Sequence, residues 1–454
     1  MRLIDGLNLY IRSIFIMKTT LKTSFLLLAA IGLTQMQANA QINKVKHVVV
    51  IYMENHSFDN LWGQFSGADG LDQAKKENII QVDASGQPYT TLPPIPRNSA
   101  FPTNLPNNYF NIDQYMAADQ ISPDPTHRFY QEQFQIDGGK MDKYALYNDN
   151  KGFTMGYYNT KDLPLYNLAK KYTICDHFFH SAFGGSFLNH QWLIAAASPV
   201  FPNAAERLIA KEDASGKLIK DGMITPDGYA VNTANSVNLH PKKDDPAKLV
   251  PTQTGLTIGD RLSDKKISWA WYSGGWNNAI KGKPDPTFTY HHQPFAYFTR
   301  FAPGTPGGKK HLKDETEFLE AAKKGTLPAV SFVKPIGLEN EHPGESTVTG
   351  GENHAVELIN AVLNRPNGKN SVIILTYDEN GGFWDHVAPP VIDKWGPGTR
   401  IPALIISPFA KKGYVDHTNY ETVSILSFIE KRWGLKPLNE RDKKADPLSN
   451  AFKF

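Results

Sequence analysis

The chain has 454 residues, 41% of them hydrophobic and 20% charged, and this composition excludes an intrinsically disordered protein. Lys and Arg number 48 against 45 Asp and Glu, so the net charge of +3 is too small for a protein that binds nucleic acid mainly by electrostatics. The single cysteine, Cys175, excludes an internal disulfide and any metal centre built from several cysteines.

The first forty residues have the pattern of an export signal. Residues 17–22 are basic, residues 24–33 are apolar, and Ala38-Asn39-Ala40 supplies the small side chains that a signal peptidase requires. The apolar run is shorter than the roughly 20 residues that cross a bilayer. We therefore predict a cleaved signal peptide over residues 1–40 with Met17 as its start, no stable membrane insertion, and a periplasmic or secreted protein.

Strands and helices alternate along the rest of the chain. The strands are expected at 45–53, 173–179, 267–272, 327–334, 371–377 and 401–407. The helices are expected at 161–172, 256–262, 314–324, 352–364 and 419–433. This alternation predicts an α/β fold with a mainly parallel sheet flanked by helices. Residues 41–454 are interpreted as one domain, with a loop-rich segment at 75–127 and an insertion at about 200–252.

Polar residues follow the first predicted strand, at the edge where ligands bind in such sheets. Glu54 and Asn55 offer a carboxylate and an amide oxygen, which are ligands that a divalent cation prefers. The alternative is structural, because Asn55 or Ser57 could cap a helix that begins near Phe58. Both interpretations stay open for these residues alone.

A second acidic site follows the strand at 371–377. Asp378 and Glu379 precede Asn380-Gly381-Gly382, and adjacent carboxylates repel each other unless a cation or a proton joins them. A solvated turn is the alternative, since Asp, Asn and Gly favour turns. Asp385-His386 follows closely and is a candidate pair for orienting the metal ligands.

Ser186 follows Gly184-Gly185 and precedes a predicted helix. Backbone N–H groups at a helix N-terminus favour an anion such as phosphate, which makes Ser186 a candidate nucleophile. An ordinary N-cap serine is the alternative. The chain has neither a G-x-S-x-G elbow at Ser186 nor an ATP-binding P-loop sequence.

Four histidines stand in loop-like segments: His127, His291, His292 and His342. Each alone is better explained as a structural histidine that forms a hydrogen bond. Together they could donate to an oxyanion and protonate a leaving group. With a cation and a nucleophile, they complete the set of groups that phosphoryl transfer requires.

Five segments carry a resemblance to a known family. They are HVVVIYMENHSFDN (47–60), DPTHRF with GGKMDKY (124–129 and 138–144), HFFHSAFGGSFLNHQ (177–191), TYDENGGFWDHVAPP (376–390) and the segment 396–435. They are similar to the bacterial phosphoesterases that comprise acid phosphatase A and the non-specific phospholipases C, which are related to the alkaline phosphatase superfamily. The likeness extends from about residue 44 to 438. It implies an alkaline-phosphatase-like fold with loop insertions.

The resemblance also implies the roles of the site residues. Ser186 corresponds to the nucleophile, and His127, His291, His292 and His342 to the residues that face the phosphoryl group. The implied ligands of a divalent metal ion, whose identity is open, are Glu54, Asn55, Ser186, Asp378 and Glu379.

The function expected from these residues is an exported, metal-dependent acid phosphatase that hydrolyses phosphomonoesters through a phosphoserine. The serine and the paired histidines favour this branch, and protonated histidines suggest a mildly acidic optimum. The alternative is a phospholipase C that hydrolyses phosphodiester head groups. The expected partners are thus phosphoester small molecules or phospholipid head groups. A remote alternative is a non-catalytic periplasmic oxyanion-binding protein, against which the clustered carboxylates argue because they repel anions.

Overall fold

The computed structural model describes residues 42–214 and 218–454, and Lys46–Lys453 form one compact unit. The predicted signal peptide over residues 1–40 lies outside the described residues. In the described part of the chain, no helix is both long enough and apolar enough to cross a bilayer.

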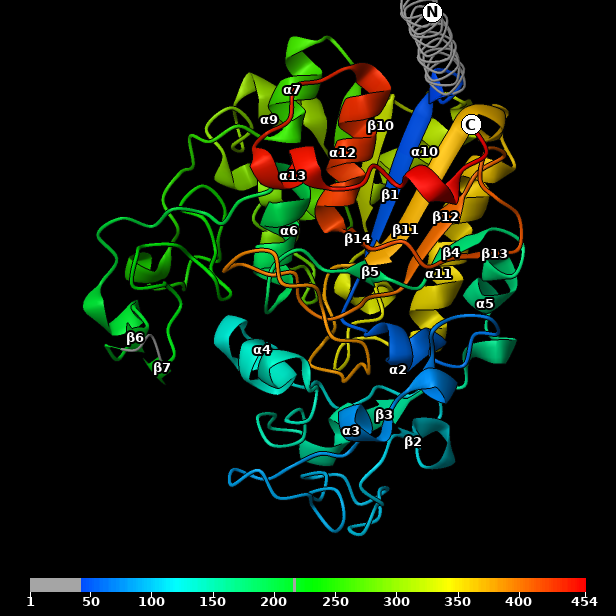
Figure 1. Cartoon of the computed structure of the whole chain (residues 1–454). Coiled ribbons are helices and arrows are strands. Elements are labelled where there is room, and N and C mark those ends of the chain that lie inside the picture. Colours follow the sequence, from blue (N-terminus) through cyan, green and yellow to red (C-terminus); the bar gives the residue numbers. More distant parts are fainter. Residues whose placement is uncertain (1–41, 215–217) are drawn as a thin grey trace, which may run out of the picture. The chain divides into compact units, whose positions relative to one another are not determined.

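An eight-stranded sheet forms the centre of this unit (Figure 1). Its spatial order is β13 (Tyr414–Asp416), β4 (Thr173–Cys175), β12 (Ala403–Ile406), β11 (Ser371–Tyr377), β1 (His47–Met53), β10 (Val330–Lys334), β8 (Trp269–Ser273) and β9 (Leu312–Asp314). Within this sheet β12 runs antiparallel to both neighbours, and every other pairing is parallel. The predicted α/β fold with a mainly parallel sheet is confirmed.

β1 is a central strand because its side chains are apolar on both faces. Val48 to Met53 are all buried, as expected for a strand covered by helices on both sides. Met53 pairs with Tyr377 of β11, and Ile51 pairs with Val333 of β10. The carboxyl ends of β1, β10 and β11 therefore meet at one edge of the sheet.

Helices cover both faces of the sheet (Figure 1). The hydroxyl of Tyr52 donates to the carbonyl of Asn189 in α6 (Ser186–Ala195), which contacts α7 (Ile258–Asp264) and α12 (Thr422–Trp433). Side chains alternate along a strand, so Tyr377, in register with Met53, lies on the other face. There α11 (Val348–Leu363) contacts α5 (Pro164–Ala169) and α10 (Glu315–Lys324).

The remaining elements are short. The helices are α2 (Phe58–Trp62), α3 (Lys76–Ile79), α4 (Phe129–Ile136), α8 (Trp276–Ala279), α9 (Pro306–His311) and α13 (Glu440–Lys444). The strands are β2 (Phe110–Asn111), β3 (Gly156–Tyr157), β5 (Phe178–Phe179), β6 (Lys211–Glu212), β7 (Leu218–Lys220) and β14 (Tyr420–Glu421). These strands pair two by two, outside the main sheet.

Two predicted elements differ from the structure. The strand expected at 173–179 is divided: β4 joins the main sheet between β12 and β13, whereas β5 pairs with β14. The helix expected at 161–172 is confined to α5, since Pro164 occupies its first turn and favours a start there. The described residues of 200–252 contribute only β6 and β7 as strands, and the insertion stays a prediction.

Candidate active site

Glu54 and Asn55 leave β1 in a sharp turn held by the end of β11. Asn55 has a φ of 65°, in the left-handed region that Asn tolerates better than most residues. Its N–H donates to Oδ1 of Asp378 over 3.2 Å. A Cβ at Gly381 would lie 2.2 Å from the carbonyl oxygen of Asn55, so this approach requires glycine. Ser57, rather than Asn55, caps α2.

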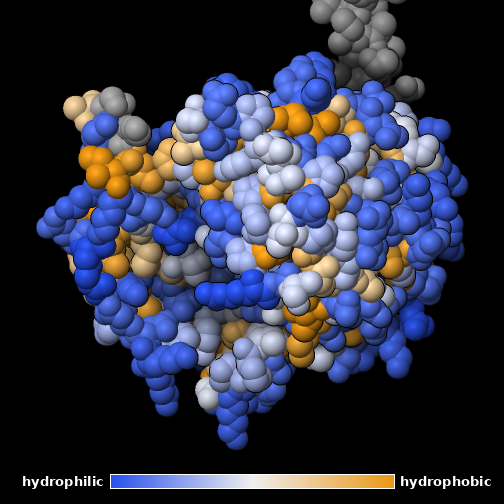
Figure 2. All heavy atoms as spheres, turned by 90° about the horizontal axis from the view of Figure 1, so that it is seen from below, coloured by the Kyte–Doolittle hydropathy of each residue, from blue (hydrophilic) through white to orange (hydrophobic). Residues whose placement is uncertain are grey.

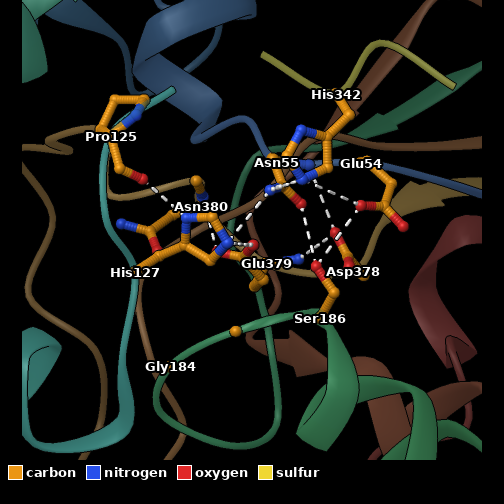
Figure 3. A network of polar contacts seen from close by, with 12 residues as sticks. Glu54, Asn55, Pro125, His127, Gly184, Ser186, His342, Asp378, Glu379 and Asn380 are labelled. Atoms are coloured by element: carbon orange, nitrogen blue, oxygen red, sulfur yellow. Dashed lines mark hydrogen bonds and ion pairs between the residues drawn. The ribbon is translucent and has the colours of Figure 1, made fainter. Parts of the chain in front are cut away.

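Ser186 is the first residue of α6 and faces this turn (Figure 3). Its Oγ lies 3.4 Å from Oε2 of Glu54 and 3.2 Å from Oδ1 of Asn55. Gly184 has a φ of 82°, and a Cβ there would lie 2.4 Å from the backbone nitrogen of Phe129. The two glycines thus let the chain turn closely enough to bring the hydroxyl to the strand ends.

Asp378 and Glu379 are fully buried beside Asn55. Oδ1 of Asp378 also accepts from the N–H of Glu379, and Oε2 of Glu379 accepts from the N–H of Gly381. Within the described residues, Oδ2 of Asp378 and Oε1 of Glu379 are buried without a hydrogen-bond partner. Burial and the nearby Glu54 raise the pKa of Asp378 to about 7. Burial and Asp378 raise the pKa of Glu379 well above its ordinary value.

Lys334 is a site residue that the sequence analysis did not identify. It ends β10, is fully buried, and places Nζ 2.6 Å from Oε1 of Glu54. Burial alone would raise the pKa of Glu54, but His292 and Lys334 outweigh it and hold that pKa well below its ordinary value. A lysine that ends an otherwise apolar strand, at the edge where Glu54 lies, was the available signal.

The carboxylates fit a divalent cation in charge and in donor type. Glu54, Asp378 and Glu379 can carry three negative charges against the single charge of Lys334. Within the described residues, one oxygen each of Asp378 and Glu379 has no hydrogen-bond donor. Oxygen ligands of this kind suit Mg²⁺, Ca²⁺ or Mn²⁺. The three carboxylates are spaced more widely than in a compact metal site. Groups of described residues with three ligand atoms within 4.8 Å of one another exist, but Glu54, Asp378 and Glu379 do not form one.

Glu54 does form such a group with His190 and His292. The ammonium of Lys334 lies on the same oxygen of Glu54 that approaches His292, and its positive charge disfavours a cation at that point. The oxygen-rich group of Glu54, Asn55, Asp378 and Glu379 is therefore the better candidate for holding the metal.

His127 and His342 both direct Nε2 toward Asn55 (Figure 3). The two Nε2 atoms lie 3.3 Å and 3.0 Å from Nδ2 of Asn55. Their Nδ1 atoms lie 2.7 Å and 2.6 Å from the carbonyls of Pro125 and Pro343, which places a proton on each Nδ1. Burial would lower the pKa of His342, but the carboxylate of Glu54 outweighs it, so this pKa is raised.

His291 and His292 lie deeper, beside His190. Nε2 of His292 is 2.6 Å from Oε1 of Glu54, and the rings of His292 and His190 stack with centroids 4.8 Å apart. Burial lowers the pKa of His292 to about 4 and that of His291 well below its ordinary value. These lowered pKa values favour the neutral form of both imidazoles, and the role of the paired histidines as cationic donors stays a prediction.

Asp385 and His386 lie in a different cluster from the one predicted. Asp385 accepts from Nε of Arg400 over 2.8 Å. His386 contacts Asp59 through Nδ1 at 2.6 Å and Asp69 through Nε2 at 3.1 Å. These contacts give the pair a structural role around Arg400, so the proposal that it orients the metal ligands was wrong.

The Ser186 hydroxyl lies at a helix N-terminus, between a carboxylate and an amide, at the carboxyl edge of the sheet. This arrangement suits a hydrolase that acts on phosphoric ester bonds. The comparisons with known proteins agree with this class of enzyme. The chain belongs to the Phosphoesterase family, whose profile matches residues 45–436.

Several characterised relatives are phospholipases C. Phospholipase C B of Mycobacterium tuberculosis is 25% identical over 458 residues, which cover 91% of this chain and 78% of that protein. Non-hemolytic phospholipase C of Pseudomonas aeruginosa is 22% identical over 474 residues, which cover 94% of this chain and 60% of that protein. A solved protein of the alkaline phosphatase superfamily from Vibrio parahaemolyticus has a TM-score of 0.35 and 12% identity, over 62% of this chain and 65% of that one.

Proposed function

We propose that the protein is a metal-dependent phosphoesterase of the phospholipase C type, which cleaves the phosphodiester head groups of phospholipids with Ser186 as its nucleophile. The relatives named phospholipase C support this substrate class, since they match along most of the chain. The acid phosphatase type expected from the serine and the paired histidines has less support than this alternative.

The position of the Ser186 hydroxyl is the observation that carries the proposal. Oγ is within 3.4 Å of the buried Oε2 of Glu54, an ionised carboxylate that accepts its hydrogen bond. A divalent cation held by Glu54, Asn55, Asp378 and Glu379 would lower the pKa of the hydroxyl and screen the charge of the phosphate.

The chain's own residues account for the remaining steps. The N–H groups at the start of α6 hold oxygens of the phosphate, and Oγ of Ser186 attacks phosphorus in line with the departing oxygen. The Oγ proton passes to Oε2 of Glu54 during the attack, and Glu54 returns it when Ser186 is released. The imidazolium form of His342, whose pKa is raised, gives its Nε2 proton to the departing oxygen as the P–O bond breaks, and His127 directs its Nε2 to the same place. Water then attacks the phosphoserine from the vacated side and releases Ser186, with one of the same imidazoles as the base.

A direct assay tests this function. The purified protein, supplied in turn with Ca²⁺, Mn²⁺, Mg²⁺ or Zn²⁺, is given p-nitrophenyl phosphorylcholine as the diester and p-nitrophenyl phosphate as the monoester. We expect faster turnover of the diester, loss of turnover on chelation, and its return with one of the metals. Equal activity before and after exhaustive chelation would remove the metal from the proposal.

A phosphomonoesterase is the second candidate, and the imidazoles favour it. A monoester dianion has one more charged oxygen than a diester, and His127 and His342 offer two ring nitrogens beside one amide. The same pair of substrates decides between the two. An oxyanion-binding protein would bind the esters and release no product from either.

A further inference from the structure

A run of six apolar residues, Val387-Ala-Pro-Pro-Val-Ile392, leaves the site and enters solvent. The side chain of Val391 is 100% exposed and that of Ile392 is 51% exposed, and Ala388 is exposed as well. A run of exposed apolar residues is unfavourable in water and usually marks a surface that something else covers. Val391 forms a protruding tip, whereas Pro390 and Ile392 beside it line a cavity together with Tyr420 and Arg441.

The tip lies at the edge of the sheet that carries the site. The segment connects β11 to the antiparallel β12, so it must lie at the carboxyl end of β11, where Asp378 and Glu379 also lie. Figure 2 views this edge, and shows hydrophobic atoms in several groups around a hollow.

Two contacts join the end of this segment to the site. The carbonyl of Trp395 accepts from the N–H of Phe183, three residues before Ser186, over 2.7 Å. The ring of Trp395 lies 6.0 Å from that of Phe129, two residues after His127. A surface on which the tip rests would therefore lie against the rim of the site.

The residues beside the tip suit a lipid surface. Nζ of Lys394 lies 4.5 Å from the ring centre of Trp395, is held there by Asp227, and its side chain is 58% exposed. Tryptophan and lysine next to protruding aliphatic side chains are typical of segments that lie in the interface of a membrane. Two exposed aliphatic side chains are too few for a stable dimer interface, which buries about 800 Å² on each partner.

We propose that residues 387–395 dock on the surface of a phospholipid bilayer, with Val391 and Ile392 inserted among the acyl chains, and thereby hold the site at the head groups. The proposal rests on the proposed function for its purpose, but the docking itself does not depend on turnover.

The test compares binding to vesicles with hydrolysis of a water-soluble diester. V391D/I392D is compared with the wild type by co-sedimentation with phosphatidylcholine vesicles, and in the p-nitrophenyl phosphorylcholine assay. We expect vesicle affinity to fall by about a hundredfold, since burial of each aliphatic side chain contributes a factor of about ten or more. Turnover of the soluble diester should stay within about twofold of the wild type.

Leu256 is the matched control, because its side chain is 50% exposed and it lines a cavity with Ala195, at the end of α6 opposite to Ser186. L256D should bind vesicles as the wild type does. Unchanged sedimentation of V391D/I392D overturns the proposal, and so does an equal loss on vesicles and on the soluble diester. A wild-type dimer that the double variant dissociates, seen by sedimentation velocity, also overturns it in favour of a second copy. If the wild-type protein binds vesicles but hydrolyses no diester, the docking proposal stands and the proposed function is wrong.

Discussion

Residues 54–59 and 378–386 supply acids to two buried clusters whose charges are balanced in different ways. The Ser186 cluster consists of Glu54, Asn55, Ser186, Asp378 and Glu379. The Arg400 cluster consists of Asp59, Asp69, Asp385, His386 and Arg400. Each cluster takes acids from both of these segments. The difference in how their charges are balanced therefore comes from the cations that the rest of the chain supplies.

Arg400 is fully paired. Its Nε donates to Asp385 over 2.8 Å, its Nη2 donates to Asp59 over 3.2 Å, and its Nη1 donates to two backbone carbonyls. In the Ser186 cluster, by contrast, Lys334 pairs with Glu54 and donates to the carbonyl of Tyr52. Among the described residues, Asp378 and Glu379 have no lysine or arginine partner, and only His190 and His127 approach their unbonded oxygens, at 3.8 Å and 3.4 Å. A buried carboxylate without a partner is costly, which favours a functional role for the Ser186 cluster and a structural role for the Arg400 cluster.

The sharpest test of this contrast is Ser186→Ala. We expect turnover of p-nitrophenyl phosphorylcholine to fall at least about a thousandfold, because the nucleophile is lost, while the melting temperature changes little. Ser181→Ala is the matched control in the same segment: Oγ of Ser181 donates to Glu421, so this change should cost about 1–2 kcal/mol of stability and leave turnover intact. Retained activity in Ser186→Ala would assign the chemistry elsewhere.

Arg400→Met should give the largest loss of stability, about 3–5 kcal/mol, because Asp59 and Asp385 would remain buried without their cation. Urea unfolding monitored by tryptophan fluorescence measures it. Added divalent metal should not restore the loss, since the metal is proposed to bind the other cluster. Recovery with metal would break the distinction between the two clusters.

Lys334→Met should cost less, about 3 kcal/mol without metal, because His292 still contacts Glu54. Here the loss should become smaller when the divalent ion that supports turnover is added, since a cation also compensates the carboxylates. Unfolding in chelator and in metal gives the two values. Lys324→Met, which removes an exposed pair with Glu320, is the control and should leave the free energy of unfolding nearly unchanged in both conditions.

The smallest expected effect is the pH dependence that His386 gives to the Arg400 cluster. Burial lowers the pKa of His386, but Asp59 and Asp385 outweigh it and raise this pKa from 6.5 to about 9. Its protonated form therefore stabilises the fold fully below about pH 6.5, and this contribution is lost as the pH rises through 9. His386→Gln should remove up to about 2–3 kcal/mol of that decline in unfolding free energy. An unchanged slope between pH 6.5 and 9 would contradict the assignment.

Pattern and composition predicted the sheet well where the strands are long and apolar. β1, β10, β11 and β12 lie within their predicted ranges, and β8 ends one residue beyond its range, at Ser273. A strand covered on both faces must be continuously apolar, which makes it easy to predict. β9 and β13 were not predicted. Each has three residues and is an outermost strand of the sheet, so it is a strand only because it pairs with its one neighbour. Short strands carry too little periodicity to be distinguished from loops.

The sequence by itself determined which residues stand at the strand ends, because the polar residues after β1, β11 and the Gly184-Gly185 turn interrupt apolar runs that could not accommodate them. Only the tertiary structure decided how these residues are paired. Lys334 joined Glu54 through the register of β10 with β1, and Asp385 and His386 joined Arg400 instead of Asp378 and Glu379. Pairing depends on which charged groups from distant segments meet inside the folded protein. The spacing of two residues along the chain does not give the distance between their side chains in the fold.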